Sequence, residues 1–362
     1  MDVELKTVLI LGLLSLTILL FSCRVEDTIS PSDNVESMPY DHLSDYRFFK
    51  GALKNLEPED GVIPYDLNTS LFSDYAGKTR FIYVPDGRKA QYRVNDVFEF
   101  PVGTILIKNF YFWHDLRDSL EGRTIYETRL IFRKSGGWEA ASYLWGSAQS
   151  DAEYHVPGKD VHVNWIHYDG SAQSTLYHIP NINECKACHN KLEKLVPIGP
   201  KARNINKDYT YRSGLMNQLA YWTVEGILSG TPDPASAPRV PVWDDASSGS
   251  LDERARAYLD INCAHCHNVD GPANISGLFL AYDVADSTAL GICKSPVAAG
   301  AGTGGFSFNI VPGNPNESIM VYRMGSALTG VAMPELARSV VHDKGVQLIR
   351  DWIASLPDGE CE

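Results

Sequence analysis

Residues 250–267 read Ser-Leu-Asp-Glu-Arg-Ala-Arg-Ala-Tyr-Leu-Asp-Ile-Asn-Cys-Ala-His-Cys-His, and this stretch decides most of what the sequence predicts about the fold. Ser250, followed three residues later by Glu253, forms a capping box, which is the sequence signature of a helix N-terminus. Apolar residues then recur on one face of the expected helix, which runs directly into Cys263. The helix therefore ends in a Cys-x-x-Cys-His pentapeptide at residues 263–267.

The chain closes with a second amphipathic helix. Asp343 can cap its N-terminus, and Pro357 stops it. Its apolar positions share one face and are Val346, Ile349, Trp352, Ile353 and Leu356. Together with the helix that leads into Cys263, this pattern predicts an all-α domain over residues 250–362.

A further Cys-x-x-Cys-His sequence begins at Cys185, 78 positions before Cys263. Two thiols one helical turn apart can add to the two vinyl groups of a haem, and the histidine that follows then reaches the iron. We therefore expect two haem c groups as cofactors. The residues expected to hold them are Cys185, Cys188, Cys263 and Cys266 as covalent attachment points, and His189 and His267 as axial iron ligands.

Two other interpretations of the paired cysteines fit less well. A zinc site with four cysteine ligands would need an unusually long spacing between its two pairs and would leave both histidines unexplained. A thioredoxin-like redox motif requires a strand–helix–strand context, which the surrounding sequence lacks. Haem attachment accounts for both the duplication and the histidines.

The second axial ligand of the haem at Cys263 is expected to be a methionine, because thioether sulfur favours reduced iron. Met333 is our choice, since it precedes Pro334 in a predicted loop. Met320 and Met324 lie one turn apart on a predicted helix and could equally fill the core.

The second ligand of the haem at Cys185 is less defined. Met216, on a predicted helix downstream, is the preferred residue. His178, just before the motif, and an open iron position are the alternatives. The two irons therefore have unlike settings, and we expect them to differ in reduction potential.

The N-terminus predicts export. Residues 8–21 form an apolar run of signal-peptide length that ends in Leu20-Phe-Ser-Cys23, similar to a lipoprotein signal. We expect a lipoprotein-type signal peptide over residues 1–23, lipidation at Cys23 and a polar tether over residues 24–40. The weak positive charge before the apolar run leaves an uncleaved anchor as the alternative. Either way the protein would be exported and anchored to a bacterial membrane, on the periplasmic or cell-surface side.

Two cysteines belong to neither the signal nor the motifs. Cys293 and Cys361 could pair as a disulfide in an oxidising compartment or remain as separate thiols.

The first half of the mature chain has strand-like patterning. Apolar or alternating runs at 80–84, 104–112, 124–132 and 138–145 are separated by turn residues. We therefore expect an antiparallel β-rich domain over residues 41–180.

The domain order follows from these boundaries. A first haem-binding segment covers 181–230, and a Pro-, Ser- and Gly-rich linker covers 231–249. The fold class expected is α+β and multidomain: an N-terminal antiparallel β-rich domain, a haem-bearing segment, and an all-α cytochrome c-like domain over 250–362.

Four segments carry a family resemblance: Leu71–Arg80, Phe100–Lys108, Glu127–Leu130 and Pro197–Asn204. With the two haem motifs, they resemble an uncharacterised family of exported bacterial di-haem c-type cytochromes. The resemblance covers nearly all of the mature chain and implies a C-terminal cytochrome c domain. It supplies no substrate.

The net charge of −13 argues against nucleic acid as a partner. We expect electron transfer between redox partner proteins, with the acidic surface guiding docking. A di-haem peroxidase or another haem oxidoreductase with one open iron is the enzymatic alternative. A third alternative is a binding module, in which the β-rich domain recognises a polymer or a partner.

Overall fold

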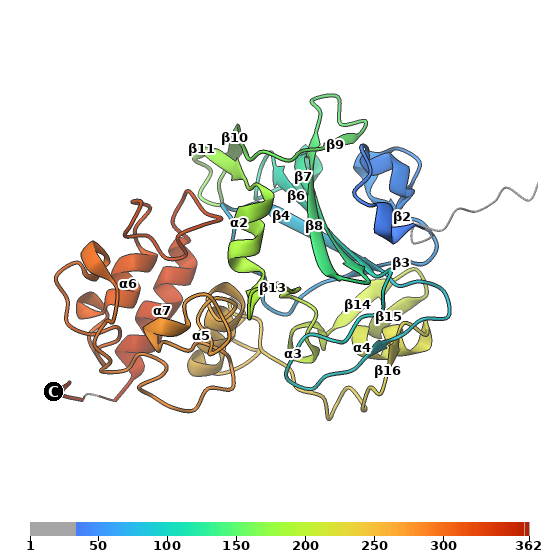
Figure 1. The fold of residues 1–362 in the computed structure, drawn as a ribbon. Helices are drawn as coiled ribbons and strands as arrows, with labels where there is room; N and C mark the ends of the chain where they lie inside the picture. The colour runs from blue at the N-terminus through green and yellow to red at the C-terminus, as the bar shows by residue number, and fades with distance from the viewer. Residues whose placement is uncertain (1–33, 358, 362) are drawn as a thin grey trace, which may run out of the picture.

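The structure is a computed structural model that describes residues 34–357 and 359–361 (Figure 1). The expected signal peptide and the lipidation site Cys23 lie outside these residues. Within the described part of the chain, no helix combines the length and apolar character needed to cross a membrane.

A six-stranded antiparallel sheet forms the centre of the molecule, in the order β3-β4-β6-β7-β8-β9 (Figure 1). The expected strand runs fall on its four longest members. The bounds are β3 Val62–Tyr65, β4 Gly77–Tyr83, β6 Ile105–Trp113, β7 Arg123–Lys134, β8 Gly137–Trp145 and β9 Ala152–Tyr154.

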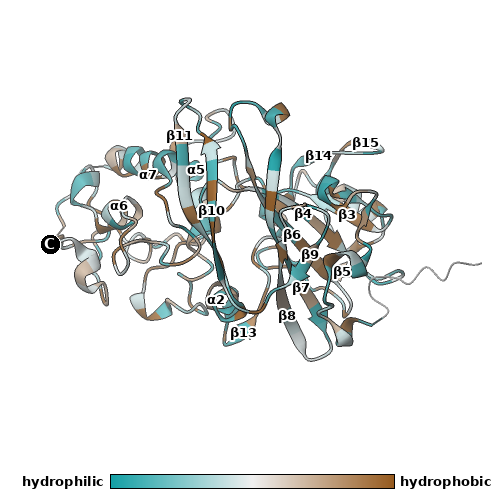
Figure 2. Ribbon diagram, turned by 90° about the horizontal axis from the view of Figure 1, so that it is seen from above, coloured by the Kyte–Doolittle hydropathy of each residue, from teal (hydrophilic) through white to brown (hydrophobic). Residues whose placement is uncertain are grey.

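The two faces of this sheet have different surroundings. Alternate residues of a strand point to opposite faces, so Ile105 and Ile107 lie on one face and Leu106 on the other. The Ile105 face packs against the N-terminal turns in a buried core. The Leu106 face packs against later parts of the chain. Both apolar and polar stretches occur along these strands in Figure 2.

The other strands form short two-stranded pairs. The antiparallel pairs are β1 Phe49–Lys50 with β2 Glu57–Pro58, β10 Lys159–Ile166 with β11 Ala172–Ile179, β12 Asn190–Lys191 with β13 Lys194–Leu195, and β14 Asp208–Tyr211 with β15 Gly214–Asn217. A parallel pair joins β5 Ala90–Gln91 to β16 Leu228–Ser229.

The helices of the described residues are mostly short. The α-helices are α2 Ile182–Cys188, α3 Ala202–Ile205, α4 Gln218–Val224, α5 Leu251–Asn262, α6 Ile319–Met324 and α7 Asp343–Ser355. The 3₁₀ turns are Val35–Ser37, Leu43–Tyr46, Leu53–Asn55, Ser119–Glu121, Asn274–Ser276, Gly300–Thr303 and Pro315–Glu317.

The expected fold class, α+β and multidomain with an all-α cytochrome c-like domain over 250–362, is wrong. The two helices predicted at the ends of that region form as α5 and α7, and the Ser250 capping box is present. Between α5 and α6, however, the chain is irregular apart from three short 3₁₀ turns. Strand (27%) exceeds helix (22%) in the structure. The expected cap at Asp343 does not form, because Asp343 is the first helical residue and His342 is the N-cap without a side-chain hydrogen bond. Helices at both ends of a segment do not dictate helix in the Gly- and Pro-rich stretch between them.

The regions expected as separate domains share buried contacts. Ile261 of α5 belongs to the same core as Ile63 of β3 and Trp222 of α4. Arg203 of α3 and Asp260 of α5 form a buried ion pair at 2.8 Å. The segment 231–249, expected as a linker, contributes Ala237 to this core, and its Val240 is also buried.

Candidate functional site

Both Cys-x-x-Cys-His sequences open on one cavity. Its volume is about 590 Å³, within the range of small-molecule sites. The lining includes all four motif cysteines and both motif histidines. In Figure 1, α2 lies beside β8 of the sheet, and α5 lies below α2, next to α7. The fold therefore brings together two motifs that lie far apart in the sequence.

The first motif is carried by α2. Asn181 caps this helix by accepting hydrogen bonds from the backbone N–H groups of Asn183 and Glu184. Cys185 and Cys188 follow within the helix, one turn apart. His189 ends it, and its backbone N–H donates to the Cys185 carbonyl at 2.9 Å.

The second motif lies just beyond α5. Cys263 is the C-cap of the helix, and the chain continues in tight turns. The backbone N–H of His267 donates to the Cys263 carbonyl at 2.9 Å. Both motifs therefore close the same hydrogen bond, from the histidine to the first cysteine, although one lies within a helix and the other after a helix end.

The ring of His189 has a defined tautomer. Its Nδ1 lies 2.8 Å from the carbonyl oxygen of Val196. Because a carbonyl can only accept, Nδ1 must carry the proton and donate it. In the neutral ring, the lone pair is then on Nε2, which is the atom that an iron-ligating histidine uses when a backbone carbonyl orients its other nitrogen.

The ring of His267 reaches the same state through Ser276. The Ser276 hydroxyl donates to the Ala273 carbonyl at 2.7 Å, so its oxygen accepts from Nδ1 of His267 at 3.3 Å. Burial lowers the pKa of His189 to about 3 and that of His267 to about 4, because the imidazolium form loses its hydration. Both rings are therefore neutral at physiological pH, as metal ligation requires.

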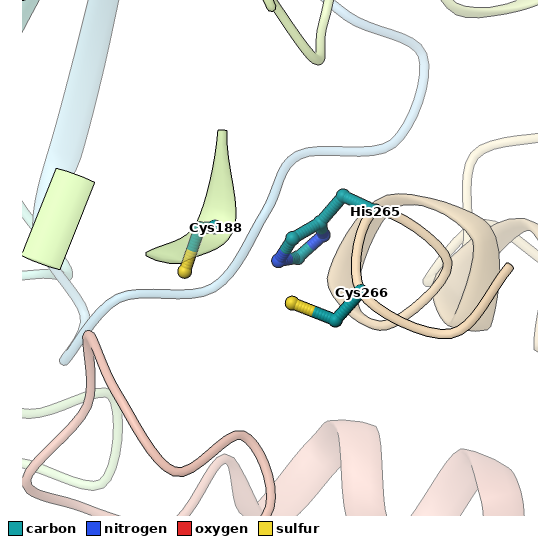
Figure 3. Close-up of side chains that lie close together, drawn as sticks. All are labelled: Cys188, His265 and Cys266. Carbon is teal, nitrogen blue, oxygen red and sulfur yellow. The ribbon is translucent and has the colours of Figure 1, made fainter. Parts of the chain in front are cut away.

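One cysteine of each motif, Cys188 and Cys266, lies close to the other, with His265 beside them (Figure 3). Sγ of Cys188, Sγ of Cys266 and a ring nitrogen of His265 all lie within 4.8 Å of one another. A hydrogen bond between the two thiols lowers the pKa of Cys188 and raises that of Cys266. Nδ1 of His265 is buried and has no hydrogen-bond partner among the described residues.

The first cysteine of each motif has a raised pKa. Burial raises the pKa of Cys185, and it raises that of Cys263 to about 12. All four motif cysteines are unpaired, whereas Cys293 and Cys361 are joined by a disulfide. The thiols that haem attachment would need are thus free.

Met333 lines the cavity and is held in place by its backbone. Its N–H donates to the Arg323 carbonyl at 3.1 Å, and its carbonyl accepts from the Arg338 guanidinium at 2.9 Å. This loop lies beside the second motif, because the Arg338 charge acts on the Cys263 thiol. Met320 and Met324 of α6 also line the cavity, and both are buried in the local core.

The two ligands considered for the first motif differ in where the structure places them. Met216 lies on β15, is 37% exposed and does not line the cavity. His178 lines the cavity, but its Nδ1 contacts Asp160 at 2.6 Å and its Nε2 contacts Glu184 at 3.1 Å. Burial opposes protonation of His178, yet these two carboxylates outweigh it and raise its pKa.

Two features of the site escaped the sequence reasoning. The first is the position of His265, which the pentapeptide alone does not define. The second is a row of cations on the cavity side of the sheet, Arg80, Lys108 and Arg129. The i, i+2 spacing along each strand predicts which face a residue occupies, but only the strand register shows that the three are neighbours.

No protein-family model matches this chain, and neither the curated proteins nor the solved structures contain a match to it. The resemblance to exported bacterial di-haem cytochromes therefore stays a prediction.

Proposed function

We propose that this chain is an exported c-type cytochrome that carries two covalently bound haems and transfers electrons between protein partners. The observation that carries the proposal is the convergence on one cavity of two motifs that close the same backbone hydrogen bond, each with free thiols and a neutral histidine whose Nε2 is unprotonated. These residues are compatible with haem attachment in both their chemistry and their local geometry.

Each residue would have a defined role. Cys185 and Cys188 would hold one haem, and Cys263 and Cys266 the other, through thioether bonds. His189 and His267 would each ligate an iron, and Met333 would complete the second site. The bound irons would supply one-electron redox chemistry, while the protein fixes their ligands and surroundings.

The position of the motifs supports a relay. Because the Cys188 and Cys266 sulfurs lie within 4.8 Å, the two attachment points are neighbours and an electron has a short path between them. The net charge of −13 suits docking to a basic donor or acceptor and disfavours nucleic acid. Lipidation at Cys23 would keep the protein at the membrane surface where such partners meet.

The test is a haem count on the purified protein by pyridine haemochrome and intact mass. We expect two haems per chain, and one in each of the variants Cys185→Ala/Cys188→Ala and Cys263→Ala/Cys266→Ala. The matched control Cys293→Ala/Cys361→Ala should retain two. A wild-type protein that carries zinc at the Cys188–His265–Cys266 cluster and no haem would refute the proposal.

An enzymatic function is favoured by one observation. Met216 lies away from the cavity, and both nitrogens of His178 are occupied, which would leave the iron at His189 with an open position. A di-haem peroxidase would then show one high-spin haem and would consume peroxide. Two low-spin haems without peroxide turnover would exclude this alternative.

A further inference from the structure

Three cations form a row on the cavity side of the central sheet. Arg80 of β4 pairs in register with Lys108 of β6, and Lys108 pairs with Arg129 of β7. Residues opposite one another on neighbouring strands project to the same face. All three line the cavity that holds both motifs.

The two arginines in this row have anionic partners. Arg80 contacts Asp66 at 3.0 Å, and Arg129 binds Glu127 through two nitrogens at 2.6 and 2.8 Å. Tyr177 donates a further hydrogen bond to Glu127, so that carboxylate is fully engaged. The positive charges of Arg80 and Arg129, which flank Lys108, are therefore balanced by the carboxylates of Asp66 and Glu127.

Lys108 differs from its neighbours. Among the described residues it forms no ion pair, and its ammonium lies 4.7 Å from the centre of the Phe110 ring. Burial lowers its pKa well below the ordinary value, and the neighbouring cations Arg80, Lys78 and Arg129 lower it further, while Glu127 opposes the shift. An uncompensated cation in a cavity wall is costly unless an anion occupies the cavity.

The row of three cations lies on the side of the cavity that carries the first motif. Arg129 lies opposite Ser142 of β8 in the register of the sheet. Helix α2, which carries Cys185 and Cys188, packs against the same strand β8. An anion bound at Lys108 would thus lie beside the group attached at this motif.

We propose that Lys108, flanked by Arg80 and Arg129, binds a propionate carboxylate of the haem attached at Cys185 and Cys188. This inference rests on the proposed function, which supplies the haem. A carboxylate is the anion that lysine and arginine side chains recognise through charge-assisted hydrogen bonds. The β-sheet then acts as a wall of the haem cavity, and its charge tunes one haem rather than recognising a separate polymer.

The reduction potential of that haem measures the interaction. A positive charge nearby disfavours the ferric state, so its removal should lower the potential. We expect Lys108→Gln in the haem-loaded protein to shift the ratio of reduced to oxidised haem about tenfold at one site, which is about 59 mV for a one-electron couple. Lys108→Arg should retain the wild-type potential. Lys194→Gln, at an exposed lysine on β13, is the matched control and should move neither potential appreciably.

The outcomes separate the inference from the function on which it rests. If both haems are attached and Lys108→Gln moves neither potential, the propionate assignment is wrong and the di-haem proposal stands. If Lys108→Gln converts one haem to a high-spin spectrum, Lys108 is an iron ligand and the assignment is again wrong. Wild-type protein without covalent haem would instead overturn the proposed function. Circular dichroism verifies that each variant is folded.

Discussion

The surroundings of the two motifs differ although their local turns are the same. His189 and His267 both donate a backbone hydrogen bond to the first cysteine of their motif, and both rings hold a proton on Nδ1. The first turn lies against a sheet that carries charged side chains, whereas the second lies among loops near Met333. The comparison teaches that the pentapeptide determines how a haem could be held, and the rest of the fold determines how that haem would behave.

The largest expected difference between the two haem sites comes from removing the proposed sulfur ligand, Met333. We expect Met333→Ala to abolish the near-infrared methionine-to-iron band entirely, because Met333 is the proposed sulfur ligand and lines the cavity that both motifs share. Met216→Ala should leave the band intact, since that side chain lies outside the cavity. Absorption spectroscopy of the oxidised protein measures both. A band that survives in Met333→Ala would return Met320 or Met324 to consideration.

The link between the two settings can be tested through Arg203. Its ion pair with Asp260 joins the segment after the first motif to the helix before the second, and both side chains are almost fully buried. Arg203→Ala should lower the free energy of unfolding by about 3–5 kcal/mol, because the buried Asp260 carboxylate loses its counter-charge and keeps only the Tyr282 N–H as a partner. Urea denaturation measures the loss.

A matched control for Arg203 is available on the surface. Arg93→Ala breaks an exposed pair with Glu99 and should cost less than about 1 kcal/mol. Equal losses in the two variants would mean that the buried pair does not couple the two settings.

The helix caps allow a finer comparison. Asn181 accepts two backbone hydrogen bonds at the start of α2, at 2.9 and 3.1 Å, while Ser250 accepts one at 3.3 Å at the start of α5. Asn181→Ala should therefore cost about 1 kcal/mol and Ser250→Ala less. Asn181→Asp and Ser250→Thr keep an acceptor and should restore most of the stability. Thermal unfolding measures which of the two alanine variants loses more stability. A larger loss of stability in Ser250→Ala than in Asn181→Ala would contradict the prediction.

The smallest expected effect is a pH dependence of the free energy of unfolding that comes from His178, just before the first motif. The carboxylates of Asp160 and Glu184 raise the pKa of His178 in the folded state. The stabilisation is therefore complete below the unfolded pKa of about 6.5 and is lost as pH rises through the folded value. Since the side chain is 41% exposed, we expect less than about 1 kcal/mol. Unfolding of wild type and His178→Gln at pH 6 and pH 9 should differ only at pH 6.

The sequence predicted features that depend on neighbouring residues. The caps at Ser250 and the helix at Asp343 are local patterns, and the structure contains both helices. The irregular stretch between them was missed because glycine and proline positions do not show how a loop packs. The buried pairing of Arg203 with Asp260 ties α3 to α5, and nothing in either local sequence indicates that contact.

In the proposed site too, features set by neighbouring residues were predictable and features set by contacts across the fold were not. The six motif residues follow from spacing alone, whereas Lys108 stands out only when the register of β4, β6 and β7 is known. Met216 was chosen for its distance along the chain, and the β14–β15 hairpin carries it away from the cavity. Sequence spacing therefore identifies residues that act within a turn and fails for residues that act across a sheet.

The closeness of Cys188 and Cys266 has a consequence for the assembly of the protein. In an oxidising compartment, two free thiols this near can be joined by a modest backbone movement, and a bond between them would block both motifs at once. Under the proposed function, a chain that formed this bond before haem attachment would be unable to accept either haem. The proposal therefore requires that both thiols stay reduced until the haems are attached.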